Sequence, residues 1–212
     1  MNAHDVSVKG AVFDFGGVIC RAPSSAAYAG LSRICGLSPA ELEKGFALHR
    51  RAYDSGEVEC DGLYRRILAD LKPGAVPEWD PEDLFRADSV LWTEPEPATV
   101  ELMREIAGEG AKVGILTNMP ERFYREYFLP LFPEAAEIAS AIVVSGCEKC
   151  AKPDARIYET ASARMGLPGG ALAFFDDSPA NVEGAIAAGW NAAVFTSPEA
   201  AKEFWRGLRA GA

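Results

Sequence analysis

Short apolar segments alternate with amphipathic segments along most of the chain. Each apolar segment ends in polar or turn-forming residues, which predicts β-strands at 10–14, 111–117, 141–145, 171–176 and 192–196. Between the later strands, apolar residues recur with a helical period and predict helices at 97–107, 154–165 and 181–188. A strand that alternates with a helix is typical of a parallel sheet covered by helices on both faces. The predicted fold class is therefore α/β, with a doubly wound, Rossmann-like parallel sheet.

The interval between the first and second predicted strands is too long for a simple crossover. A strand–helix–strand unit takes about 30 residues, whereas about 100 residues lie between these two strands. The surplus is helical in pattern. Ser38 begins a capping box that has a proline at the first helical position, and Asp61 and Asp80 can each cap a further helix. A weaker helical pattern covers 24–34. We expect a small all-helical cap domain at 21–92, inserted into a catalytic core formed by 1–20 and 93–212.

Charge and hydropathy narrow the range of partners. The formal net charge is −10, and such a surface disfavours nucleic acid, which normally requires a basic stripe. No apolar run approaches the ~20 residues that cross a bilayer, and the short polar N-terminus lacks the pattern of a secretory signal. We therefore expect a cytoplasmic protein that binds neither nucleic acid nor membrane, and a small-molecule partner.

Two other patterns carry no chemistry by themselves. Cys147 and Cys150 form a lone CxxC pair, and the other three cysteines are scattered, so ordinary reduced thiols are expected rather than a zinc or redox site. Aromatic residues at helical spacing are expected to belong to the core or to a self-association face: Phe123, Tyr124, Tyr127 and Phe128. If these aromatic residues belong to the core, a monomer is expected; if they form a self-association face, a homodimer is expected.

Polar residues with chemical potential follow the predicted strands. Asp14, Thr117, Lys152 and the pair Asp176–Asp177 each lie at or just after the end of a strand. In an open parallel sheet the carboxyl ends of the strands share one edge, where ligands bind. These side chains are therefore expected to converge on one site.

The residue types suit a phosphate ester held by a magnesium ion. Mg²⁺ prefers oxygen ligands, which Asp14, Asp177 and the Gly16 carbonyl can supply. The Thr117 hydroxyl and the Asn118 backbone amide can donate hydrogen bonds to phosphoryl oxygens. Lys152 can stabilise the charge that accumulates on them in the transition state. Attack by Asp14 would give an aspartyl-phosphate, which water then hydrolyses.

Four segments together resemble the haloacid dehalogenase superfamily. They occur in that family's order and span nearly the whole chain: 12–19 (VFDFGGVI), 115–118 (ILTN), 152–158 (KPDARIY) and 174–183 (FFDDSPANVE). The resemblance implies a helical cap after the first motif. Segments 53–58 and 128–153 also resemble a bacterial branch that contains sugar-1-phosphate phosphatases.

The resemblance also implies roles for individual residues. It makes Asp14 the nucleophile and Asp177 a direct Mg²⁺ ligand. Asp176 would be a water-mediated ligand or a supporting acid, and Asn181 would brace this motif from the following helix. In the family the cap closes over the pocket and its inward residues choose the substrate. Here we expect Arg21, just after the first strand, to contact the substrate phosphate, and do not assign such a role to His49, Arg50 or Arg51.

Position 16 departs from the phosphatase pattern. Phosphatases of this family usually carry a second aspartate two residues after the nucleophile, which protonates the leaving oxygen and later activates water; here it is Gly16. General acid–base catalysis is worth ~10² to 10⁴ in rate. The chain is therefore a phosphatase that takes the proton from water or from a cap residue, a phosphatase for esters with easier leaving groups, or a weakened phosphate-binding protein. A metal-independent 2-haloacid dehalogenase also lacks that aspartate, but the pair Asp176–Asp177 argues against it, because neighbouring acids without a cation repel one another.

Overall fold

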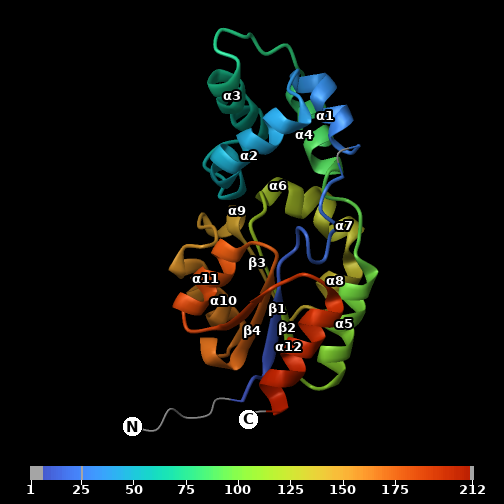
Figure 1. The fold of residues 1–212 in the computed structure, drawn as a ribbon, viewed down its shortest axis with the longest axis vertical. Coiled ribbons are helices and arrows are strands. Elements are labelled where there is room, and N and C mark those ends of the chain that lie inside the picture. Colours follow the sequence, from blue (N-terminus) through green and yellow to red (C-terminus); the bar gives the residue numbers. More distant parts are fainter. Residues whose placement is uncertain (1–6, 25, 211–212) are drawn as a thin grey trace.

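The computed structural model describes residues 7–24 and 26–210, and its centre is an all-parallel β-sheet. The strand order is β3-β2-β1-β4-β5, so the chain starts in the middle of the sheet and builds outward on both sides (Figure 1). The α/β fold class is confirmed. The strands are β1 (Gly10–Phe13), β2 (Lys112–Thr117), β3 (Ala141–Val144), β4 (Leu172–Asp176) and β5 (Asn191–Val194).

Helices cover both faces of the sheet because the strand side chains alternate between two hydrophobic clusters. In β1, Ala11 and Phe13 pack into one cluster and Val12 into the other. The first cluster is covered by α5 (Pro97–Gly108), α12 (Pro198–Ala210) and the helical segment after β2, and the second by α10 (Ala155–Met165) and α11 (Pro179–Ala187). The strand order reverses beside β1, which places a ligand crevice at that carboxyl edge.

The long interval after β1 forms a separate helical unit above that edge (Figure 1). Its helices bury a hydrophobic cluster of their own, with Leu42, Leu63 and Phe85 at its centre. They are α1 (Tyr28–Cys35), α2 (Pro39–Asp54), α3 (Cys60–Leu71) and α4 (Pro81–Val90). We call this unit the cap.

The expected helix starts are confirmed at two positions and wrong at a third. Ser38 forms the capping box of α2 with Glu41, and the Asp80 side chain accepts hydrogen bonds from the first amides of α4. Asp61 caps nothing, because α3 already begins at Cys60. The Asp61 carboxylate instead accepts hydrogen bonds from Trp79 Nε1 and Arg65 Nε, both at 2.6 Å.

Several short helices and one long one lie outside the predicted set. Residues 121–138 run through α6 (Glu121–Phe123), the π-helical η1 (Tyr124–Phe128), α7 (Leu129–Leu131) and α8 (Pro133–Ile138). The aromatic residues expected in this segment pack against the core cluster. The remaining elements outside the predicted set are α9 (Ser145–Glu148), the 3-10 helix η2 (Gly169–Ala171) and the long helix α12.

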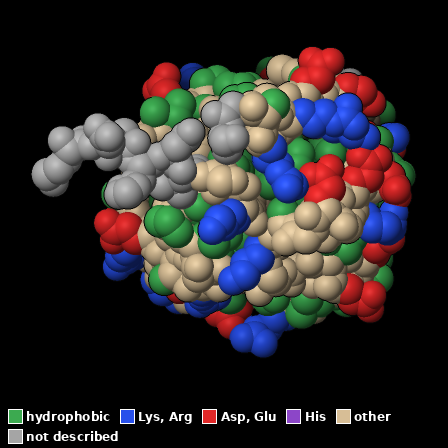
Figure 2. All heavy atoms as spheres, turned by 90° about the horizontal axis from the view of Figure 1, so that it is seen from below, with side chains coloured by type: hydrophobic (Ala, Val, Ile, Leu, Met, Phe, Trp, Pro, Cys, Tyr) green, Lys and Arg blue, Asp and Glu red, His purple; other side chains and the backbone are tan. Residues whose placement is uncertain are grey.

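Charged and hydrophobic side chains are interspersed on the surface at the end opposite the cap (Figure 2). Figure 2 shows acidic and basic side chains intermingled there. Within the described part of the chain, no helix has both the length and the apolar character that a membrane span requires.

Candidate active site

Asp14 lies one residue beyond β1, at the carboxyl edge of the sheet and under the cap. The residue is 8% exposed. The Phe15 amide and the Lys152 ammonium both donate to the same oxygen, Oδ1, at 2.7 and 2.8 Å. These two donors fix the carboxylate and leave Oδ2 as the oxygen that can face a ligand.

Lys152 is buried and holds the charged side chains of the site together. Its Nζ lies 2.8 Å from Asp14 Oδ1, 2.6 Å from Asp176 Oδ2 and 2.9 Å from the Leu116 carbonyl oxygen. Three acceptors match the three N–H donors of an ammonium. The pKa of Lys152 is raised: burial acts against its charge, and the two carboxylates outweigh that effect. Lys152 therefore stays protonated.

Asp176 is the last residue of β4 and Asp177 follows it, and the two side chains lie in different surroundings. Asp176 is fully buried and accepts hydrogen bonds from Lys152, from the Ser178 amide at 2.9 Å and from Asn181 Nδ2 at 3.0 and 3.1 Å. The Asp177 side chain is exposed to the site. Asn181 thus reaches the acidic pair from α11, which begins earlier than predicted because Pro179 occupies its first position.

Gly17 gives the Asp177 carboxylate room to approach the loop after β1. Gly17 has a φ of +73°, a region that residues with a side chain rarely adopt. A Cβ atom on Gly17 would overlap Asp177 Oδ2, so a larger residue would push this carboxylate away.

The carboxylates form a set that fits a hard divalent cation. One oxygen each from Asp14, Asp176 and Asp177 lie within 4.8 Å of one another. Burial raises the pKa of Asp14 to about 8, against the opposing effect of Lys152, and burial together with Asp176 raises the pKa of Asp177. One ammonium does not balance three carboxylates, so a cation with oxygen preference such as Mg²⁺ fits the charge and the ligand type.

The cavity over this site is enclosed partly by the cap. It has a volume of about 210 Å³ and brings Asp14, Gly16, Asn118 and Asp177 to one wall. The cap and its linker supply the other wall: Ala22, Arg50, Asp54 and Trp92.

Comparison with known proteins identifies the family. Residues 8–189 match the haloacid dehalogenase-like hydrolase family. The chain belongs to this family. The family and the hydrolase class expected from the four motifs are confirmed, and the protein is an enzyme.

Relatives of this hydrolase carry different activities in their names. A protein of Mycobacterium tuberculosis named as a phosphatase is 26% identical over 88% of this chain and 87% of its own length. A haloacid dehalogenase-family enzyme from Bacteroides thetaiotaomicron, solved with magnesium and inorganic phosphate, has a TM-score of 0.67 at 17% identity and covers 89% of this chain and 94% of its own. L-2-haloacid dehalogenase from Xanthobacter autotrophicus has a TM-score of 0.64 at 19% identity, covering 91% of this chain and 80% of its own. The two solved structures therefore share the fold with this hydrolase.

Two of the expected phosphate contacts differ in how they face the cavity of this hydrolase. Thr117 ends β2, is buried at 1% exposure and is not among the residues that line the cavity. The Asn118 side chain brackets the Lys152 peptide, accepting from its amide at 2.8 Å and donating to its carbonyl oxygen at 3.0 Å. The Asn118 backbone amide has no acceptor within the described chain, so it remains available to a ligand oxygen.

The structure does not bring Arg21 to the cavity. Its guanidinium donates to Glu94 and Glu96, each at 3.0 Å, and half of the side chain is exposed. Both partners belong to the second linker between cap and core. Arg21 therefore connects the two segments that join cap and core, and its expected contact with the substrate phosphate is not supported by its position.

The cap residues that line the cavity were not predicted. Arg50 and Asp54 lie one turn apart on α2 and face inward, whereas His49 points outward to Asp70. The available signal was their spacing of four, which places an arginine and an aspartate on one side of a helix. Trp92 gave no such signal, because its position depends on how the linker turns.

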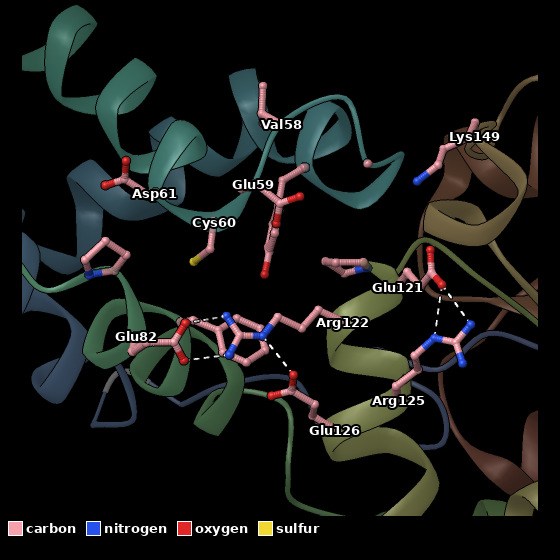
Figure 3. A pocket seen from close by; sticks show the side chains of 15 residues that line it. Val58, Glu59, Cys60, Asp61, Glu82, Glu121, Arg122, Arg125, Glu126 and Lys149 are labelled. Atoms are coloured by element: carbon pink, nitrogen blue, oxygen red, sulfur yellow. Dashed lines mark hydrogen bonds and ion pairs between the residues drawn. The ribbon is translucent and has the colours of Figure 1, made fainter.

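A second and larger opening of this hydrolase lies between the cap and the core, with a volume of about 580 Å³ (Figure 3). Arg122 on α6 donates to both oxygens of Glu82 on α4, at 2.9 and 2.6 Å. The Arg122 guanidinium also lies 3.8 Å from the centre of the Phe85 ring. This contact connects the two units at the edge of the opening.

Proposed function

We propose that this hydrolase is a Mg²⁺-dependent phosphomonoesterase that acts on a small phosphorylated metabolite, sugar phosphates included. The observation that supports the proposal is a group of three carboxylates, Asp14, Asp176 and Asp177, of which one oxygen each lie within 4.8 Å of one another. The buried Lys152 forms ion pairs with Asp14 and Asp176. Such a group is suited to a divalent cation and a phosphate dianion together. The name of the Mycobacterium tuberculosis relative is consistent with this activity.

Asp14 is the proposed nucleophile. Lys152 and the Phe15 amide hold Oδ1, so Oδ2 faces the phosphorus. Its attack breaks the ester bond and forms an aspartyl-phosphate, and water then releases inorganic phosphate. In this proposal the Asn118 amide donates to a phosphoryl oxygen, and Thr117 precedes it at the end of β2 without lining the cavity.

Asp14 and Asp177, with the Gly16 carbonyl, are the proposed ligands of Mg²⁺, and Asp176 a supporting acid. When bound, the ion screens the negative charge of nucleophile and phosphate from each other. Asp176 orients Lys152, and Asn181 orients Asp176, through the hydrogen bonds described above.

Haloacid dehalogenation is the alternative reaction for the same nucleophile. It would need no cation. The exposed Asp177 carboxylate, close to Asp14, whose pKa is raised, would then have no role. The acidic pair therefore favours the phosphatase over the dehalogenase. A phosphate-binding protein without turnover is the other alternative, and it would bind phosphate without releasing it from esters.

Phosphate release from an aryl phosphate tests the proposal. We expect turnover in the presence of Mg²⁺, its loss on chelation, and a fall of roughly 10³-fold or more in Asp14→Asn, since the nucleophile is gone. Asp83→Asn is the control, because Asp83 is an exposed aspartate of the cap. Metal-independent release of halide from a 2-haloacid, without phosphatase activity, would overturn the proposal, and so would tight phosphate binding without turnover.

A further inference from the structure

Position 16 is crowded by the Trp92 indole. A Cβ atom on Gly16 would lie 3.0 Å from Cζ3 of Trp92, which is tighter than an ordinary contact. The Trp92 indole therefore occupies the space into which a longer side chain at position 16 would extend. An alkoxide leaving group still requires a proton, so the donor is either water or another residue of the cavity.

Only one carboxyl group of the cavity wall is left for this task. Among the described residues that line the cavity, the carboxylic acids are Asp14, Asp54 and Asp177. Asp14 is the proposed nucleophile and Asp177 a proposed metal ligand. Asp54 belongs to neither role, and it reaches the cavity from the cap helix α2.

Asp54 is held against the core by its backbone. It is the last residue of α2 and is 7% exposed. The Ser145 hydroxyl, at the end of β3, donates to the Asp54 carbonyl oxygen at 2.5 Å and accepts from the Met119 amide at 2.8 Å. These bonds tie the end of the cap helix to the core through Ser145 and Met119, and Asp54 lines the same cavity as Asp14.

The side chain of Asp54 is only half engaged. Arg50 Nε donates to Oδ1 at 3.1 Å, while Arg50 Nη1 donates to Asp88 Oδ1 at 2.7 Å. Arg50 is thus shared between two carboxylates, and within the described residues no donor reaches Asp54 Oδ2. Burial raises the pKa of Asp54 to about 6; Arg50 and Lys152 act to lower it, and Asp88 acts to raise it. Oδ2 can therefore carry a proton near neutral pH.

We propose that Asp54 is the general acid and general base of this hydrolase, acting from the cap in place of a residue at position 16. The inference rests on the proposed phosphatase activity. It assigns the cavity wall opposite Asp14 a catalytic residue that closes over the substrate together with the cap.

The protons and bonds balance over two steps. In the first, Asp14 Oδ2 bonds to phosphorus, the ester P–O bond breaks, and the Asp54 proton passes to the departing oxygen to give an alcohol. In the second, Asp54 takes a proton from water as the water oxygen bonds to phosphorus and the bond to Asp14 breaks. Inorganic phosphate leaves, and Asp54 is again protonated.

Leaving groups of different basicity test the acid role. We expect Asp54→Asn to lower kcat/KM for a simple alkyl phosphate by ~10² to 10⁴. For p-nitrophenyl phosphate, whose leaving group needs no proton, we expect a loss below about tenfold. Because kcat/KM covers events only up to phosphoryl transfer, the base role does not enter. Asp54→Glu keeps a carboxyl group and should recover part of the alkyl-to-aryl ratio.

The base role has a separate signature. With p-nitrophenyl phosphate, Asp54→Asn should release a rapid burst of p-nitrophenol and then turn over slowly, because water is no longer activated. Acid quenching should then trap phosphate bound covalently to the protein. Wild-type protein should show neither the burst nor the accumulation at the same level.

Asp88→Asn is the matched control, because Asp88 shares Arg50 with Asp54 and does not line the cavity. In wild type, the alkyl-to-aryl ratio of kcat/KM should fall as pH rises through about 6, where Asp54 loses its proton. Asp88→Asn should move this fall of the ratio to lower pH, because Asp88 raises the pKa of Asp54. At a pH well below the fall, Asp88→Asn should change kcat/KM for the alkyl and the aryl phosphate by the same factor. In Asp54→Asn the ratio should not vary with pH.

The outcomes separate this inference from the proposed function. If Asp54→Asn lowers kcat/KM for both substrates by the same factor, or if wild-type protein hydrolyses aryl but not alkyl phosphates, Asp54 is not the acid and the phosphatase stands. If wild-type protein with Mg²⁺ releases phosphate from neither, the proposed function fails instead. Circular dichroism of each variant establishes that it is folded, and Asp54→Glu decides the question should Asp54→Asn be unfolded.

Discussion

A single glycine determines how closely Asp177 approaches the nucleophile loop. Gly17 combines a positive φ with a missing Cβ at the point where Asp177 Oδ2 lies. We expect Gly17→Ala to weaken Mg²⁺ binding by roughly tenfold or more, since shifting one ligand of a metal site usually costs at least that much. Isothermal titration of Mg²⁺ into the metal-free variant measures this loss.

Gly36→Ala is the matched control for the conformational cost of placing an alanine at a positive φ. Gly36 ends α1 with a φ of +67°, and a Cβ atom there would meet nothing within 4 Å. Gly36→Ala therefore carries a similar conformational cost, about 1–2 kcal/mol of stability, without touching the site. If both variants weaken Mg²⁺ binding equally, backbone strain and not the approach of Asp177 is responsible.

At the residue scale, the sequence predicted the core residues of the site better than the cap residues. Asp14 and Asp177 directly follow strands, and the shared edge of a parallel sheet brings strand ends together. The expectation that Lys152 also lies just after a strand is wrong, because α9 separates it from β3, although its side chain still reaches Asp14 and Asp176. Arg21 and Asp54 sit where their positions depend on how the linkers and α2 dock. Position after a strand is a local property of sequence, whereas the direction of a cap side chain depends on tertiary contacts such as that between Ser145 and Asp54.

At the element scale, the strands and the larger helices follow from hydrophobic periodicity, and the short segments do not. The capping box of α2, the Asp80 cap of α4 and the proline at the first position of each helix mark their starts in the sequence. The segment 121–138 changes between α-helical and π-helical backbone within a few residues. No single period describes such a segment, so its aromatic stripe was recognised while its helices were not.

The contact between α4 and α6 predicts how firmly the cap rests on the core. Arg122 donates hydrogen bonds to both carboxylate oxygens of Glu82, and its guanidinium lies over the Phe85 ring (Figure 3). Its side chain is partly exposed, and an exposed pair is worth roughly 0.2–1 kcal/mol. We expect Arg122→Ala to raise the rate of proteolytic cleavage in the linkers by roughly two- to fivefold, because the cap separates from the core more often.

Arg125→Ala is the control for that experiment. Arg125 lies one turn from Arg122 but pairs with Glu121 on its own helical segment, so it does not bridge the two units. Its removal should leave linker cleavage unchanged. Glu82→Gln should reproduce the effect of Arg122→Ala, and failure of both variants to increase cleavage would show that other contacts hold the cap.

At the scale of the whole molecule, the site joins the two units through charge. The core contributes the buried carboxylates and Lys152, and the cap contributes the carboxylates that share Arg50. Burying like charges is unfavourable without a counter-ion. Cation binding on the core side is therefore linked to the stability of the protein as a whole.

Thermal unfolding with and without Mg²⁺ measures this linkage, and its sign follows from Asp14. Burial raises the pKa of Asp14 from 3.8 to about 8 in the metal-free protein. Over that interval the folded state holds a proton that the unfolded state has lost, so Asp14 lowers the stability as pH rises. Mg²⁺ binds the ionised carboxylate and must displace that proton at lower pH. The rise in Tm caused by Mg²⁺ should therefore be several degrees larger at about pH 8 than at about pH 6.

In Asp14→Asn this difference should disappear, because the titrating group is gone. A Mg²⁺-induced rise in Tm that is the same at both pH values in wild type would mean that the cation binds without displacing a proton from Asp14.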